Sequence, residues 1–153
     1  MNKFHYLFLI LLIHLSCEPD DICSETNPST PQLVIRLYDT NQPSQPKSVD
    51  TLRITAKESN SVLQFIDADS IAIPFRINSD QMNLDFTISG GKNDELSIDY
   101  QTEDIYLSRA CGFQSRFVID NIKILGNPDW MNAIETLTKD IQIDTLAHVK
   151  IYH

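Results

Sequence analysis

The side chains of this 153-residue chain that could act as nucleophile, base or metal ligand are few and widely spaced. The cysteines are Cys17, Cys23 and Cys111, and His148 and His153 are the histidines outside the N-terminal segment. A thiol with an imidazole base is one arrangement for covalent catalysis, so Cys111 with His148 is one hypothesis. Beyond the residue types, the sequence offers no sign of the electropositive setting that a reactive thiol needs. We therefore favour structural roles for both.

The spacing of the histidines and acids also argues against a metal centre, since zinc sites use clustered Cys and His. His148 and His153 are five positions apart and would point to opposite faces of a straight strand. Asp67 and Asp69 would share a strand face and could serve as paired acids or calcium ligands, but no EF-hand spacing surrounds them. We interpret them as the solvated lip of a loop. No phosphate-binding loop, dinucleotide motif or nucleophile elbow is present, so we predict no catalytic residue, metal or cofactor.

Residues 1–16 have the composition of a secretory signal peptide. Lys3 is the only charged residue, and the apolar run that follows is shorter than the ~20 residues of a spanning helix. The run ends at Ser16-Cys17, which resembles the lipobox of bacterial lipoproteins, with His14 where the usual pattern has leucine. In those proteins the cysteine is acylated and becomes the first residue. We predict the same for Cys17; an ordinary cleaved signal is the alternative.

An acylated Cys17 would hold the protein to a membrane of the cell envelope. The acids that follow, Glu18, Asp20 and Asp21, resemble the export signal that sends Bacteroidota lipoproteins to the cell surface, and a solvated tether is the alternative interpretation. We expect a lipid-anchored protein of the outer membrane, on its periplasmic face or at the cell surface. The formal charge of −9 becomes −10 once Lys3 is removed, which argues against a nucleic-acid partner.

The two remaining cysteines, Cys23 and Cys111, are predicted to form a disulfide, because an even number of cysteines in an oxidising compartment favours pairing. The bond would close a loop of about 90 residues, which contributes roughly 4–5 kcal/mol in the chain-entropy model. Five residues separate Cys17 from Cys23 and span roughly 16–20 Å when fully extended. The folded domain would therefore begin almost at the membrane surface.

Apolar and polar residues alternate along most of the chain from Gln32 onward. This period of two is typical of half-buried strands, and it covers residues 33–38, 52–55, 71–76, 83–88, 96–101 and 148–153. Residues 39–48 and 89–94 are rich in turn residues and are predicted to be a loop and a hairpin connection. Pro74 predicts an edge strand or a bulge.

Many short strands at regular spacing favour an antiparallel β-sandwich or a small barrel, so the predicted class is mainly β. The predicted organisation is a signal peptide at residues 1–16, the acylated cysteine and a short tether at 17–31, and a single β domain at 32–153.

Residues 128–137 are the exception to the alternation. An Asn-Pro-Asp triplet resembles a helix start, and Trp130, Ile134 and Leu137 fall at i, i+4 and i+7. This pattern predicts a short helix, although Thr136 favours strand. Trp130 could stack on a sugar, but its apolar partners favour a place in the core.

Three pieces of the sequence carry a family resemblance: Asp20–Asp39, Glu103–Phe113 and Ala147–His153. The most specific is Ser-Arg-Ala-Cys-Gly-Phe within the second piece. Together they resemble the domain of unknown function 6452, a Bacteroidota family of uncharacterised lipoproteins. The resemblance implies an envelope lipoprotein with cysteines at Cys23 and Cys111, and it implies no activity.

Two function classes follow from these features. The first is a non-enzymatic binding or assembly module anchored by Cys17, which docks on an envelope protein through an exposed sheet edge. The alternative is a ligand-binding protein or an enzyme that acts on envelope material, which would need a concave pocket lined by convergent polar groups. Because no catalytic motif is present, we favour the first class and expect no enzymatic activity.

Overall fold

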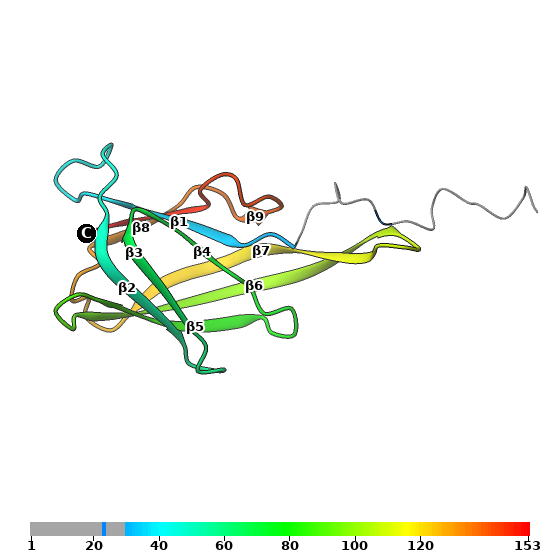
Figure 1. Cartoon of the computed structure of the whole chain (residues 1–153), viewed down its shortest axis with the longest axis horizontal. Coiled ribbons are helices and arrows are strands. Elements are labelled where there is room, and N and C mark those ends of the chain that lie inside the picture. The colour runs from blue at the N-terminus through cyan, green and yellow to red at the C-terminus, as the bar shows by residue number, and fades with distance from the viewer. Residues whose placement is uncertain (1–22, 24–29) are drawn as a thin grey trace, which may run out of the picture.

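Ten strands make up the regular structure of the described residues, which are Cys23 and 30–153, in a computed structural model (Figure 1). Cys17 and the signal segment lie outside these residues. The strands are β1 Leu33–Tyr38, β2 Val49–Ala56, β3 Val62–Ala68, β4 Ser70–Ile73, β5 Gln81–Ile88, β6 Asn93–Ser108, β7 Gly112–Leu125, β8 Ala133–Thr136, β9 Asp140–Ile141 and β10 Val149–Tyr152. Within the described part of the chain, no helix is long and apolar enough to span a membrane.

The strands form two sheets, which confirms the predicted mainly β class. The larger sheet has the order β3-β2-β5-β6-β7-β9 and is antiparallel throughout. The smaller sheet has the order β4-β1-β10-β8. In it the C-terminal strand β10 pairs in parallel with β1, so that Ile35 lies opposite Val149 and Leu37 lies opposite Ile151. The C-terminal strand that the alternation predicts is therefore present, and it joins the two ends of the described domain.

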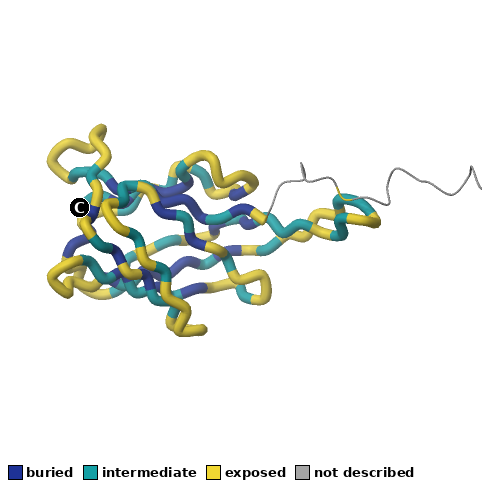
Figure 2. The backbone as a smooth tube through the Cα atoms, in the orientation of Figure 1, coloured by how far each residue is buried: buried dark blue, intermediate teal, exposed yellow. Residues whose placement is uncertain are grey.

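The inward-facing side chains of both sheets form one hydrophobic core, which is the dark blue interior of Figure 2. In β5, for example, every second residue from Met82 to Phe86 is buried, as the pleat requires. Burial of one such large apolar side chain contributes about 1.5–3 kcal/mol. The largest fully buried side chains include Tyr100, Phe86, Phe117, Leu33, Ile35, Leu37, Leu52, Ile54, Ile71, Met82, Leu96 and Ile98.

The two turn-rich segments connect strands as predicted. Residues 39–48 form the loop between β1 and β2, and residues 89–92 connect β5 to β6. Gly90 and Gly91 in this second turn have φ angles of +88° and +81°, which side chains rarely tolerate. Pro74 directly follows β4, the edge strand of the smaller sheet, where its missing N–H costs no ladder bond.

The chain changes sheets at Asp69, between β3 and β4. The Leu37 N–H donates a hydrogen bond to the Asp69 carbonyl at 2.8 Å, and Arg36 reaches the Asp69 carboxylate at 3.4 Å. Asp67, two residues earlier, has a φ angle of +46° and accepts a hydrogen bond from the Ser48 hydroxyl at 2.8 Å. The two acids therefore flank a corner of the sandwich and have different partners, and the prediction that they share a strand face is wrong.

The short helix predicted near residues 128–137 is absent, and the second half of this segment is strand β8. Ile134 pairs with Ile151 and Thr136 pairs with Val149. β8 therefore pairs with the backbone of β10 and forms the edge of the smaller sheet. Trp130 is buried, and its indole N–H donates to the Phe86 carbonyl at 3.1 Å. Pairing with β10 therefore overrides the helical spacing of the apolar residues.

The turn before β8 is held by Asp94, at the start of β6. This carboxylate is 3% exposed and accepts hydrogen bonds from three consecutive amides, those of Asp129 at 2.5 Å, Trp130 at 2.9 Å and Met131 at 2.7 Å. Three amides that converge on one carboxylate satisfy groups that burial would otherwise leave unpaired. Asp94 thus connects the larger sheet to the segment that leads into the smaller one.

Candidate functional site: the cross-linked arm

The hairpin of β6 and β7 continues beyond the sandwich as a two-stranded projection, visible at the right of Figure 1. Its neighbours end first: β5 pairs with β6 only as far as Asp99, and β9 pairs with β7 only at Phe117 and Val118. Residues 103–116, here called the arm, therefore pair only with one another among the described residues, from Glu103 opposite Arg116 to Ser108 opposite Gly112.

An aromatic cluster fixes the root of the arm. Phe75 stacks on Phe117 with ring centroids 4.3 Å apart and meets Tyr100 edge-on at 4.8 Å. Tyr100 and Phe117 lie in β6 and β7 at the point where the hairpin leaves the core. The Tyr100 hydroxyl donates to the Arg76 carbonyl at 2.8 Å, which ties the cluster to the loop after β4. Packing and hydrogen bonding at the root thus set the direction of the arm.

The proximal half of the arm is polar and self-paired. The Arg116 Nε–H donates to the Glu103 carboxylate at 2.7 Å, and the Ser115 hydroxyl donates to the Asp104 carboxylate at 2.7 Å. Both contacts join residues directly opposite in the ladder, where cross-strand pairs stabilise a hairpin. This half of the arm is therefore suited to water.

The distal half is apolar, although it lies away from the core. Tyr106 and Phe113 lie opposite each other with ring centroids 5.4 Å apart, and they are 56% and 69% exposed. Ile105, on the other face of the hairpin, is 39% exposed. Large exposed apolar groups that cluster in this way mark interaction sites more often than single ones do.

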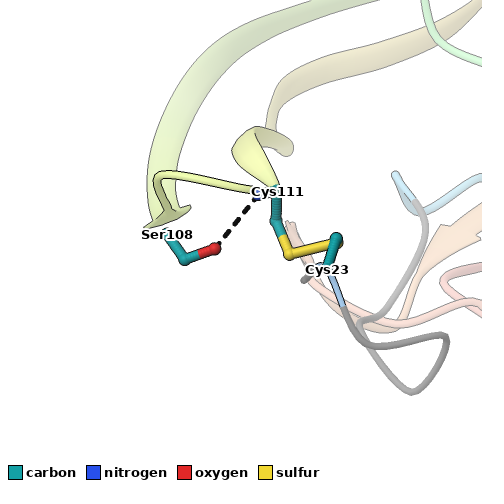
Figure 3. Close-up of a disulfide and its surroundings, with 3 residues drawn as sticks. All are labelled: Cys23, Ser108 and Cys111. Atoms are coloured by element: carbon teal, nitrogen blue, oxygen red, sulfur yellow. Dashed lines mark hydrogen bonds between the residues drawn. A yellow bond between two sulfur atoms is a disulfide. The ribbon is translucent and has the colours of Figure 1, made fainter. Parts of the chain in front are cut away.

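The end of the arm carries the disulfide. Cys111 is bonded to Cys23 with a Cα–Cα distance of 4.9 Å, and the Cys111 amide donates to the Ser108 hydroxyl at 3.1 Å (Figure 3). The predicted pair is therefore present. The structure adds its place in the fold, since the bond lies at the tip of a projecting hairpin. It also leaves no thiol at Cys111, so the hypothesis of a Cys111–His148 catalytic pair is wrong.

His148 serves the core. Its side chain is 2% exposed; Nδ1 accepts a hydrogen bond from the Val34 amide at 2.9 Å, and Nε2 lies 2.8 Å from the Ile143 carbonyl. The first contact makes Nδ1 the acceptor, so Nε2 carries the proton and the ring is neutral. His153 has a separate partner, the Lys47 carbonyl at 3.1 Å.

Acid is expected to destabilise the domain through these two histidines. Burial lowers the pKa of both, while the hydrogen bonds to Ile143 and Lys47 and the charges of Asp144 and Asp39 offset only part of that shift. The unfolded chain therefore binds protons more readily than the folded one, so stability is complete above pH ~6.5 and falls as the pH drops below that value.

Urea unfolding at pH 7.5 and 5.5 checks this expectation, because 5.5 lies above the range in which carboxylates titrate. The free energy of unfolding should be smaller at pH 5.5. A His148→Gln variant keeps a donor and an acceptor but does not titrate, so its loss between the two pH values should be smaller than that of the wild type. Equal losses in the two proteins would contradict the role given to His148.

Asp67 and Asp69, predicted as solvated acids of a loop, do not join other side chains in a metal site. Among the described residues, no group of three or more His, Cys, Asp or Glu side chains could hold a metal ion. Asp69 forms an ion pair with Arg36, and Asp67 accepts from Ser48.

A small pocket opens at the side of the sandwich between β2, β5 and the loop after β4. Its volume is about 140 Å³, and its lining is mostly apolar, including Ile54, Met82, Leu84 and Phe75. Ligand sites for small molecules usually measure ~300–1,000 Å³ and place several polar groups around the ligand. The pocket is smaller and more apolar than such a site, so the arm is the more distinctive feature of the surface.

The arm and the buried acid are the features that sequence reasoning missed. The signal for the arm was present: no glycine or proline interrupts residues 93–108, so the strand predicted at residues 96–101 had no local reason to stop there. Asp94 carried no such signal, because its partners lie 35 to 37 residues away.

Comparison with known proteins places the chain in a family. No curated protein and no solved structure matches it. The family of unknown function DUF6452 matches residues 36–153, a range that includes the whole arm and Cys111 and begins after Cys23. The match covers more than half of the chain, and the protein therefore belongs to the DUF6452 family.

Proposed function

We propose that the protein is a non-enzymatic lipoprotein of the bacterial cell envelope, of the Bacteroidota type, which is anchored by acylated Cys17 and acts as a binding or assembly module. The observation that carries the proposal is the disulfide between Cys23 and Cys111. It ties the chain just after Cys17 to the tip of the arm, and it needs an oxidising compartment to form and persist.

The geometry limits how far the domain can lie from its anchor. Cys23 follows Cys17 by six positions, so the Cα atoms of these two residues stay within roughly 20–22 Å of each other. The disulfide holds Cys23 at a Cα–Cα distance of 4.9 Å from Cys111, so the tip of the arm also stays near the acylated residue. Acyl chains contribute about 0.8 kcal/mol for each buried CH₂ group, so several chains give stable attachment. The proposed module is thus held at a short distance from the outer membrane, on its periplasmic face or at the cell surface.

The edge of the larger sheet supports a binding role. β3 is an edge strand of seven residues, and its outward side chains Val62 and Ile66 are 46% and 74% exposed. An edge strand offers unpaired backbone groups to which an extended segment of another protein can add a strand. We therefore propose an envelope protein as the partner and β3 as the edge that it contacts.

Purification of the full-length protein from bacterial membranes in mild detergent tests both parts of the proposal. Mass spectrometry should find an N-terminal peptide that begins at Cys17 and carries acyl mass, and this peptide should be absent from a Cys17→Ala variant. An envelope protein should co-purify with the wild type and be lost from an Ile66→Lys variant that remains folded and acylated.

Two outcomes would overturn the proposal. A peptide that begins at Cys17 without acyl mass would contradict the anchor. Repeated recovery of the acylated protein alone would contradict the binding role.

A further inference from the structure

We propose that the distal half of the arm rests in the interfacial layer of the bilayer to which Cys17 is attached, so that Ile105, Tyr106 and Phe113 form a second membrane contact. This inference rests on the proposed acylation of Cys17 and adds to it an orientation for the domain. The occupant of the apolar surface is therefore lipid rather than protein.

The first argument is the chemistry of the exposed surface. Tyr106 and Phe113 form an aromatic pair, and Ile105 adds an apolar group on the opposite face of the same two-stranded ribbon. Among the described residues, no third strand pairs with the ribbon here, because β5 and β9 end before the arm begins. Aromatic side chains are enriched at the level of the lipid headgroups, where one end of the ring meets water and the rest meets hydrocarbon.

The second argument is the position of this surface relative to the anchor. The disulfide joins Cys23 to Cys111, and Phe113 follows Cys111 by two residues. Six positions separate Cys17 from Cys23, so the acylated residue lies within roughly 20–22 Å of Cys23. Cys23 in turn lies 4.9 Å from Cys111, Cα to Cα, at the arm tip. Among the described exposed apolar groups, Ile66 lies on the sandwich and has no such connection to the anchor.

The third argument is the distribution of charge along the arm. The whole chain has a formal charge of −9, but within residues 103–116 the acids Glu103 and Asp104 are balanced by Arg109 and Arg116. Glu103 and Asp104 lie in the proximal half, where each is paired across the ladder. The distal half of the arm thus carries apolar groups and no acid between residues 105 and 112, while Glu103 and Asp104 lie on the side of the sandwich.

The single tryptophan provides a built-in reference for a depth measurement. Trp130 is buried beside Asp94, at the opposite end of β6 from the arm tip. Fourteen positions along β6 separate Asp94 from Ser108, or about 46 Å at ~3.3 Å per residue. Bromine atoms on lipid chains quench tryptophan only at close range, so Trp130 should be unaffected when the arm touches the bilayer.

The experiment places the acylated full-length protein in vesicles of phosphatidylcholine with or without brominated chains. Three proteins are compared: the wild type, Phe113→Trp, and Ile66→Trp as a matched control at an exposed apolar position on β3. Bromination should reduce the emission added by Phe113→Trp by about half, because a ring ~5–10 Å into the headgroup and acyl boundary meets the bromines. The other two proteins should show no change.

The alternative results each overturn the inference. If Phe113→Trp is not quenched while the acylated protein stays on the vesicles, the arm does not touch lipid and the anchor alone stands. Equal quenching of Phe113→Trp and Ile66→Trp would show that the domain has no preferred orientation. If the tryptophan at 113 is unquenched by bromine and also shielded from acrylamide, another protein surface covers it. A Cys17 without acyl mass would remove the inference together with the proposed function.

Discussion

Replacement of Asp94 by alanine is expected to lower the free energy of unfolding by about 3–5 kcal/mol, because it removes the acceptor for two buried amides and one partly buried amide. Each hydrogen bond to a charged group contributes roughly 1.5–3 kcal/mol, and the three are not additive because they share one carboxylate. The amides of Trp130 and Met131 would be left buried without this partner, whereas the Asp129 amide lies in the exposed part of the turn.

Urea unfolding followed by the fluorescence of Trp130 measures this loss, since Trp130 lies in the affected turn. Asp94→Asn keeps one carbonyl oxygen and should lose about half as much, which provides a measurable variant if the alanine protein does not fold. Asp50→Ala is the matched control, because Asp50 is an exposed aspartate of β2 and its loss should change stability by less than about 0.5 kcal/mol. Equal effects at positions 94 and 50 would contradict the assigned role.

Replacement of both Cys23 and Cys111 by serine is expected to lower the free energy of unfolding by about 2–4 kcal/mol. The 88-residue separation sets an upper bound of roughly 4–5 kcal/mol in the chain-entropy model. The expected loss is smaller, because the bond lies at the tip of the arm. Its removal also gives the native arm more freedom, since a two-stranded hairpin is only marginally stable by itself.

Two measurements check this expectation. Urea unfolding should show the loss of stability, and hydrogen exchange should become faster for the amides of residues 103–116 while those of β2 and β5 remain protected. A Ser108→Ala variant keeps the disulfide and removes only the hydrogen bond to the Cys111 amide, so it should lose about 0.5–1.5 kcal/mol. If the double variant is as stable as the wild type and its arm is equally protected, the disulfide has no structural role.

Consequences for function follow from the same bond. Without it, the arm tip and the chain next to Cys17 would no longer be held together, so the proposed orientation at the membrane would depend on the arm alone. The double cysteine variant should therefore keep the proposed acyl anchor, because that anchor is assigned to Cys17. The emission added by Phe113→Trp should become less sensitive to bromine.

Local pattern was sufficient to predict the fold class and most of the strands. Alternation in Leu33–Tyr38, in residues 83–88 and at the C-terminus reports directly on which side chains face a core, because successive side chains of a strand point to opposite faces. Gly90 and Gly91 also indicated a turn, because the positive φ angles of that turn suit no other residue well. The prediction that Cys23 pairs with Cys111 needed only the expected acylation of Cys17, which leaves two cysteines, and the expected oxidising compartment.

Contacts between distant segments decided the rest. The segment around Ile134 is a strand because its backbone pairs with that of β10. The helical spacing of its apolar residues contains no information about this pairing. In the sequence Asp94 is one more acid beside a turn, and only the fold shows that the Trp130 amide donates a hydrogen bond to it. The arm projects because β5 and β9 are shorter than the hairpin they flank, so Tyr106 and Phe113 are left outside the core. Local periodicity thus specifies which face of a strand is apolar, whereas only the packing of neighbouring strands specifies whether that face is covered.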